Sequence, residues 1–238
     1  YLTIISDTER QIRETLPEFD ITEVPLDDRR TYDMISQGKT EGVFQLESGG
    51  MRQMLSNLRP DNLEMIVAAI ALYRPGPMDS IPRFLENRMH PEKVTYRTPL
   101  VEDILDVTFG CVVYQEQVMQ IFRKVAGYSL GRADIVRRAM SKKKTDVMAR
   151  EREYFIHGLT DENGTEICRG AVKNGIREED AAALFDDMAN FAKYAFNKSH
   201  AVAYAYLSYR TAYLKCHYPS QYLASLLTSV QGSQAKTA

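Results

Sequence analysis

The highest local charge in the sequence lies in a basic run at 132–144. This run holds six positive side chains and one negative, a local charge of +5, whereas the whole chain has a net charge of −2. Arg137 and Arg138 are adjacent, and each guanidinium offers a planar fork of donors that matches phosphate oxygens, which lysine lacks. Two such neighbours can grip a polyphosphate from two directions. The alternative is a solvated basic helix face, because most charge runs are simply surface.

A second candidate is the run 191–200, Phe-Ala-Lys-Tyr-Ala-Phe-Asn-Lys-Ser-His. Asn197 or Ser199 suits the N-cap of a following helix. The amide N–H groups of that helix start, with Lys198 beside them, would form an anion site. His200 could stack on a base or donate to a phosphate. The alternative is an aromatic stripe that faces the core, followed by a cap.

The third candidate combines three short runs at 42–48, 72–77 and 114–117, in which polar groups stand at the ends of apolar segments. Pro75 and Pro77 restrict the loop, and Gly76 allows a backbone conformation that other residues avoid. Arg74 on this loop could position a backbone phosphate, or could pair with Glu47 or Glu116. The spacing does not choose between these roles.

Several catalytic patterns are absent from the sequence. It has no GxxxxGK[ST], no GxGxxG and no GxSxG run, and no Asp-x-Asp pair suited to two-metal catalysis. The four histidines show no metal-ligand spacing. The residues alone therefore predict a chain that binds a phosphorylated ligand, contains no metal site and no catalytic residue, and performs no complete reaction.

Composition narrows the class of protein. The 238 residues are 44% hydrophobic and 26% charged, which is typical of a globular domain with a sizeable core. The near-neutral charge excludes a uniformly basic nucleic-acid coat, though not a local basic patch.

Three scattered cysteines indicate a reducing, cytoplasmic setting. No apolar run approaches the roughly 18 residues of a membrane span. Because the chain starts at Tyr1 within an apolar pattern, we expect a piece of a longer protein.

The hydrophobic period is mainly helical, which predicts one continuous, mainly α unit. Two apolar runs are exceptions: 42–46 is expected to be a strand or a buried turn, and 111–114 a short strand. The predicted helices lie at 2–15, 30–37, 48–58, 63–72, 80–88, 99–106, 115–126, 131–141, 145–157, 165–174, 178–192, 199–217 and 220–230.

Several sequence runs, taken in order, resemble those of the C-family DNA polymerases, the family of the bacterial DNA polymerase III alpha subunit. Several long motifs in one order are more specific than any single motif. The matching runs are VPLDD at 24–28, GVFQLES at 42–48, YRPGP at 73–77, YQEQVM at 114–119, ADIVRRAMSKKK at 133–144, FNKSHAVAY at 196–204, Tyr209–Leu214 and HYP at 217–219.

The resemblance implies a helical fingers domain with a few short strands. It implies that residues 1–25 are the C-terminal tail of the palm with a linker, that 26–230 form the fingers, and that 231–238 are a flexible tail. The three palm aspartates that hold two metal ions in this family would precede Tyr1. Mg²⁺ is therefore expected in the full enzyme but not in this chain, which is expected to be inactive alone.

The same resemblance assigns residue roles. Arg137 and Arg138 would bind the triphosphate of the incoming dNTP, with Lys198 and His200 lining the same pocket. A second set of candidate pocket or nucleic-acid contacts consists of Asn197, Ser199, Arg74, Gln45, Lys142, Lys143 and Lys144. The implied partners are dNTP, primer–template DNA, and the sliding clamp and clamp loader through regions outside this chain.

Two alternatives remain. One is the fingers region of an error-prone, repair-type paralogue, whose motifs are similar. The other is a non-catalytic nucleic-acid-binding module that kept the helical scaffold, although the joint presence of Arg137, Arg138, Lys198 and His200 argues against it.

Overall fold

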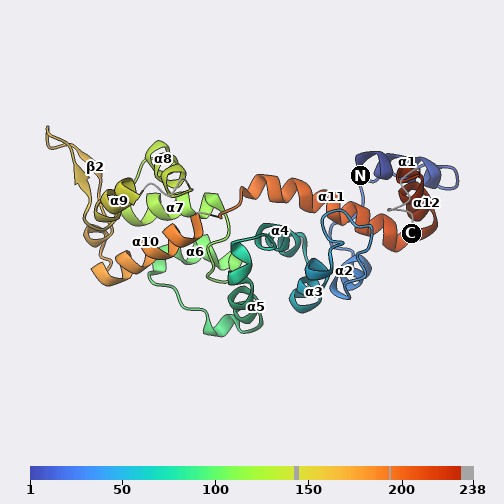
Figure 1. Cartoon of the computed structure of the whole chain (residues 1–238), viewed down its shortest axis with the longest axis horizontal. Helices are drawn as coiled ribbons and strands as arrows, with labels where there is room; N and C mark the ends of the chain where they lie inside the picture. The colour runs from blue at the N-terminus through green and yellow to red at the C-terminus, as the bar shows by residue number, and fades with distance from the viewer. Residues whose placement is uncertain (142–144, 193, 232–238) are drawn as a thin grey trace. The chain divides into compact units, whose positions relative to one another are not determined.

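The chain folds mainly into helices, as the sequence predicts (Figure 1). The computed structural model describes residues 1–141, 145–192 and 194–231. Two compact units make up the chain, in place of the one continuous unit that the sequence predicts: the first unit is Tyr1–Ile70 with Ser199–Ala238, and the second unit is Ala71–Lys198.

Six helices belong wholly or mainly to the first unit. They are α1 (Leu2–Arg13), α2 (Arg29–Ser36), α3 (Gly49–Leu58), α4 (Leu63–Leu72), α11 (Lys198–His217) and α12 (Pro219–Ser229). Helix α1 packs on α12, and α2 packs on α3. The fully buried Tyr209 of α11 donates from its hydroxyl to the Pro25 carbonyl at 2.6 Å and meets the Tyr32 ring at 5.3 Å. Segments far apart in the sequence therefore share one core.

The run 42–46 is a buried turn, the second of the two alternatives that the sequence left open. Val43 and Leu46 have no exposed surface, and the Thr40 hydroxyl donates to the Leu46 carbonyl at 2.6 Å. Gln45 adopts a left-handed backbone conformation with φ of 61° and is exposed. Val43 and Leu46 are therefore buried without strand pairing.

The second unit contains α-helices, short 3₁₀ turns and one two-stranded hairpin. Its elements are η1 (Pro77–Ser80), α5 (Ile81–Met89), η2 (Pro91–Lys93), η3 (Pro99–Val101), α6 (Glu102–Leu105), η4 (Asp106–Thr108), α7 (Gln115–Ala126), α8 (Leu130–Ser141), α9 (Thr145–His157), β1 (Leu159–Thr160), β2 (Glu166–Cys168), η5 (Val172–Asn174) and α10 (Glu178–Ala192).

The core of this unit lies among α7, α8, α9 and α10, each of which contacts the other three. Phe122, Phe155 and Phe185 come from three of these helices, and their ring centroids lie 5.2 to 6.0 Å apart. All three are at most 2% exposed. Such tilted and edge-on aromatic contacts add to the apolar area that they bury. This cluster fixes the helices that carry the candidate site.

The helix predicted at 165–174 is wrong. Residues 159–168 form an antiparallel hairpin, β1 with β2, and η5 follows. The base of the hairpin requires two glycines, Gly158 with φ of 91° and Gly170 with φ of 85°. A Cβ on either one would meet backbone atoms of the opposite strand end. This close approach between distant glycines ends the helical pattern, and the local hydrophobic period does not reveal it.

The strand predicted at 111–114 is reduced to one residue, because only Tyr114 forms a bridge, parallel to Phe196. Most of the other predicted helices are present within about two residues of their expected ends. The region predicted as one helix at 99–106 is instead a 3₁₀ turn followed by the one-turn helix α6. Apart from Gln231, the predicted tail at 231–238 lies outside the described residues.

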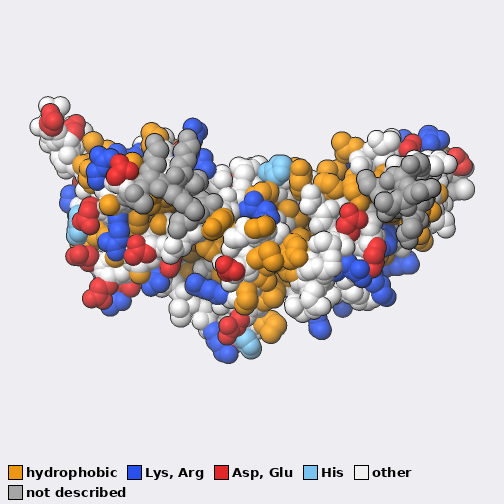
Figure 2. Space-filling view, in the orientation of Figure 1, with side chains coloured by type: hydrophobic (Ala, Val, Ile, Leu, Met, Phe, Trp, Pro, Cys, Tyr) orange, Lys and Arg blue, Asp and Glu red, His pale blue; other side chains and the backbone are white. Residues whose placement is uncertain are grey.

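Charged side chains of both signs are interspersed over the face shown in Figure 2. This pattern agrees with the near-neutral net charge of the chain. Within the described residues, no helix combines the length and the apolar character needed to cross a membrane.

Asp28 connects α2 to the end of α11 and provides a test of the first unit. Its carboxylate accepts from the Thr31 backbone N–H at 2.8 Å and bonds the His217 ring nitrogen Nε2 at 2.8 Å. Burial raises the pKa of Asp28, but the hydrogen bonds from His217 and Thr31 outweigh burial, so the pKa is lowered overall. The charged form is therefore the one that stabilises the fold.

We expect Asp28→Ala to lower the free energy of unfolding at pH 7 by about 1 kcal/mol, as for other lost N-caps. Since the folded pKa is depressed, this contribution is complete above the pKa of an unfolded aspartate, about 4, and is lost as pH falls through the folded value. Urea unfolding of wild type and variant should therefore converge in acid. Asp27→Ala, at an exposed neighbour, is the control, and an equal loss in both variants would contradict the role of Asp28.

Candidate functional site

Helix α8 places both predicted guanidiniums on one carboxylate. Arg137 donates from Nε and Nη2 to Asp134 Oδ1 at 3.0 and 2.8 Å, and Arg138 Nη2 lies 2.7 Å from Asp134 Oδ2. This arrangement follows from helical spacing, because residues three and four apart lie on one face. The Arg137 side chain is 16% exposed and that of Arg138 is 67% exposed. The two arginines therefore converge on a single anion.

The position of α8 results from its apolar residues. Ala133, Val136 and Met140 are at most 1% exposed and belong to the core cluster of the second unit. The hydrogen bonds from Arg137, together with the charges of both arginines, lower the pKa of Asp134. The aspartate thus stays ionised and holds the guanidiniums together.

Arg132, at the start of the basic run, pairs with a different carboxylate. Arg132 lies 2.8 Å from Glu151 of α9 through Nη2, and its guanidinium stacks over the Tyr128 ring at 5.1 Å. The Tyr128 hydroxyl donates to the same carboxylate at 3.0 Å. Arg132 therefore links α8 to α9 through its ion pair with Glu151. Lys142, Lys143 and Lys144 lie outside the described residues.

Backbone hydrogen bonds hold the second candidate run, residues 191–200, against the start of α7. The Gln115 N–H donates to the Phe196 carbonyl at 2.9 Å, and the Phe196 N–H donates to the Val113 carbonyl at 3.3 Å. The Gln115 side-chain amide adds a bond to the Ala195 carbonyl at 3.0 Å. These bonds join two motifs that are some eighty positions apart in the sequence.

A carboxylate lies at the helix start where the sequence predicted an anion site. Glu116 accepts from the Lys198 backbone N–H at 3.0 Å and from the Asn197 side-chain amide at 2.9 Å. The positive end of the α11 dipole favours a negative group at this position. The Lys198 ammonium lies 5.1 Å from the Tyr114 ring centroid, within cation–π range. The structure thus brings Asn197 and Lys198 together around one acidic side chain.

Arg74 braces the same segment. Its Nη2 donates to the Tyr194 carbonyl at 2.7 Å, and its guanidinium lies 4.0 Å from the Phe196 ring centroid. Burial lowers the pKa of Arg74. Beside it Gly76 has φ of 106°, and a Cβ there would overlap the Tyr194 ring. The sequence left open whether Arg74 pairs with a carboxylate. In the structure Arg74 forms neither of the two ion pairs considered, and contacts the Tyr194 carbonyl and the Phe196 ring instead.

The remaining predicted residues belong to the first unit. The His200 ring meets the Tyr204 ring at 4.2 Å, and Tyr204 meets Phe44 at 5.2 Å. Gln45 follows Phe44 directly, and Ser199 is exposed at the start of α11. His200 and Gln45 therefore flank one aromatic row within that unit.

Sequence reasoning missed two acidic residues that organise the site. Asp134 has a recognisable signal, since it precedes Arg137 and Arg138 by three and four positions in a predicted helix. Glu116 was considered only as a partner for Arg74, and its contact with α11 has no local signal. Among the described residues, no group of three or more His, Cys, Asp or Glu side chains could hold a metal ion.

The family model for the bacterial DNA polymerase III alpha subunit finger domain matches residues 1–163. The chain belongs to this family. Its relatives include the DNA polymerase III subunit alpha of Thermus aquaticus, 45% identical over 243 residues, which cover all of this chain and 19% of the relative. The subunit of Chlamydia trachomatis serovar D is 51% identical over 205 residues, or 86% of this chain and 16% of the relative.

The corresponding subunit of Staphylococcus aureus strain COL is 43% identical over 238 residues, covering the whole chain and 21% of the relative. The chain therefore spans about a fifth of the length of the curated relatives that it matches. The membership confirms the family that the motifs indicated.

Replacing Glu116 tests how the 194–198 segment is held. We expect Glu116→Ala to speed amide hydrogen exchange at Lys198 and its neighbours by about tenfold to a hundredfold, since a charge-assisted hydrogen bond contributes about 1.5–3 kcal/mol. Exchange followed by mass spectrometry would measure this effect. Gln120→Ala, at an exposed position of the same helix, is the matched control. Equal protection in both variants would show that Glu116 does not anchor the segment.

Proposed function

We propose that this chain is the fingers part of a DNA-directed DNA polymerase and that Arg137 and Arg138 bind the triphosphate of the incoming dNTP. The observation that supports this most is the convergence of both guanidiniums on the Asp134 carboxylate. Two cations that share one small anion are spaced to share a larger one.

Both guanidiniums contact the Asp134 carboxylate, Arg137 through Nε and Nη2 and Arg138 through Nη2. Arg138 is mostly exposed, so its fork can reach a ligand in solvent. In phosphoryl transfer, cations placed around the phosphates neutralise charge and hold the line of attack. A triphosphate would therefore add to, or compete with, the contacts of Asp134.

Lys198 and His200 are proposed as further pocket residues on the first turn of α11. Glu116 holds the backbone of Lys198, and Arg74 holds the segment that leads into the helix. Asn197, Ser199 and Gln45 remain candidates for contacts with nucleotide or template. In this proposal Arg74 acts by positioning the segment that carries Lys198.

We propose that the chemical step belongs to the full-length polymerase, in which palm residues outside this chain hold Mg²⁺. We propose that residues 1–25 belong to the palm and its linker, that 26–230 form the fingers, and that the chain alone is inactive. Primer–template DNA, the sliding clamp, the clamp loader and a cytoplasmic location belong to the same proposal.

The test is steady-state kinetics of a full-length alpha subunit that contains this chain. We expect Arg137→Ala and Arg138→Ala each to raise KM for dNTP by about tenfold or more, because each removes charge-assisted hydrogen bonds to phosphate. Arg138→Lys should fall between Arg138→Ala and wild type, because lysine keeps the charge without the planar fork.

Arg150→Ala serves as the control, since Arg150 is 65% exposed on α9. Unfolding measurements should show little loss of stability in any of these variants. Unchanged dNTP kinetics in both alanine variants would refute the proposed triphosphate site. Lost affinity for duplex DNA with normal use of dNTP would instead favour a nucleic-acid-binding role for the pair.

A further inference from the structure

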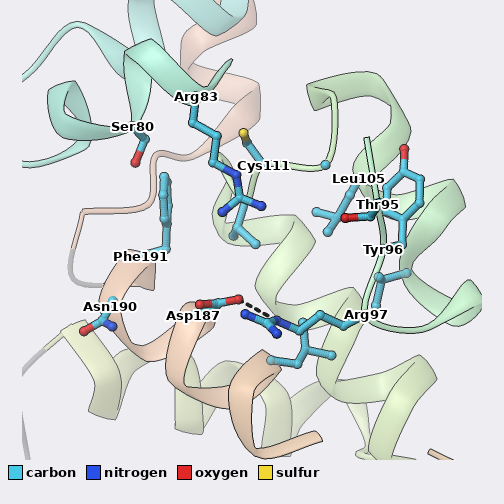
Figure 3. Close-up of a pocket in the computed structure, with 14 residues that line it drawn as sticks. Ser80, Arg83, Thr95, Tyr96, Arg97, Leu105, Cys111, Asp187, Asn190 and Phe191 are labelled. Atoms are coloured by element: carbon cyan, nitrogen blue, oxygen red, sulfur yellow. Dashed lines mark hydrogen bonds and ion pairs between the residues drawn. The ribbon is translucent and has the colours of Figure 1, made fainter. Parts of the chain in front are cut away.

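A cavity of about 230 Å³ lies in the second unit (Figure 3). It is formed by α5, the segment 95–97, the segment 101–112 and α10. Figure 3 shows Arg83 reaching into it, with Phe191 on one side and the ion pair of Arg97 with Asp187 nearby. None of the residues proposed for nucleotide binding lines this cavity.

The floor of the cavity is apolar. Val101, Leu105, Val112 and Leu184 line it, and each is at most 7% exposed. They are members of the core cluster that packs α7 to α10. A ligand group that enters this space therefore meets hydrocarbon and removes further apolar surface from water, which is favourable at about 25 cal/mol per Å².

The rim carries a surplus positive charge. Arg97 and Asp187 neutralise each other at 2.9 Å. Arg83 forms no ion pair with a carboxylate of the described residues, and its positive charge partly offsets the burial that raises the pKa of the Cys111 thiol. Ser80 and Asn190 add hydrogen-bonding groups at the same rim. The cavity thus joins an apolar interior to a polar, cationic mouth.

We propose that this cavity is a docking pocket for a peptide segment of a protein partner, one that presents a large apolar side chain next to a carboxylate. The apolar side chain occupies the floor beside Phe191, the carboxylate pairs with Arg83, and Ser80 and Asn190 bond the peptide backbone. This proposal does not depend on the nucleotide site.

Size and polarity favour a peptide side chain over a nucleotide. Pockets for drug-sized ligands measure roughly 300–1,000 Å³, so this one has room for about a single large side chain. A nucleobase would bring donors and acceptors on its edges against the Val and Leu floor. Burying polar groups without hydrogen-bond partners is costly, whereas a Phe, Leu or Met side chain has none.

The minimal probe is N-acetyl-phenylalanine, which combines a ring, a carboxylate and an amide. Ligand-observed saturation-transfer NMR can follow its binding to the full-length subunit that contains this chain. We expect weak, saturable binding with the strongest transfer to the ring protons. N-acetyl-phenylalaninamide, which lacks the carboxylate, and N-acetyl-alanine, which lacks the ring, should each bind about tenfold more weakly.

Arg83→Gln is the informative variant, since Arg83 is exposed and its loss leaves the core intact. It should weaken N-acetyl-phenylalanine by about tenfold and leave the carboxamide unaffected, whereas Arg150→Gln should change neither. Equal binding of acid and carboxamide to wild type would overturn the proposal. So would Arg83-dependent binding of deoxythymidine monophosphate without binding of N-acetyl-phenylalanine, because that would identify a nucleotide pocket.

Discussion

The positions of Asn197 and Lys198 in the second unit depend on one local attachment, the hydrogen bonds that hold residues 194–198 against the start of α7. Three contacts hold this short segment. They are the backbone hydrogen bonds of Gln115, the hydrogen bond from the Lys198 N–H to the Glu116 carboxylate of α7, and the hydrogen bond from Arg74 to the Tyr194 carbonyl. The segment connects α10, which is part of the core, to α11. Without this attachment Lys198 and Asn197 would sit on an unrestrained connection, because a loop residue gains a defined position only from the contacts that hold it.

The two acidic residues at the site have related physical roles. Asp134 lies between two guanidiniums that would otherwise repel one another, and Glu116 occupies the positive end of a helix. Each carboxylate satisfies donors in the absence of a ligand. Under the proposed function, a triphosphate at the arginine pair would meet groups already oriented by an anion, so less side-chain entropy would be lost on binding. The cost would be competition, since the Asp134 carboxylate would repel the incoming charge.

The sequence predicted the structure of some segments well and of others poorly. The amphipathic patterns of 115–126, 131–141 and 178–192 predicted α7, α8 and α10 closely, because each helix buries one face and its period is local. The pattern at 165–174 misled, because Gly158 and Gly170 pack against each other and force a hairpin. The run 42–46 could be either strand or turn from its composition, and its burial in the first unit decided for the turn.

The sequence by itself determined the family, through several motifs in one order, and the pairing of Arg137 with Arg138, because helical spacing is a property of the local chain. The contact of Asp134 with both arginines follows from the same helical spacing. Only the tertiary structure decided that Arg74 contacts the Tyr194 carbonyl and Phe196, that Glu116 occupies the start of α11, and that Arg83 stands over an apolar cavity. Each of these contacts joins residues from elements far apart in the chain. Their meeting depends on how the helices pack, and no local pattern of residue types encodes that.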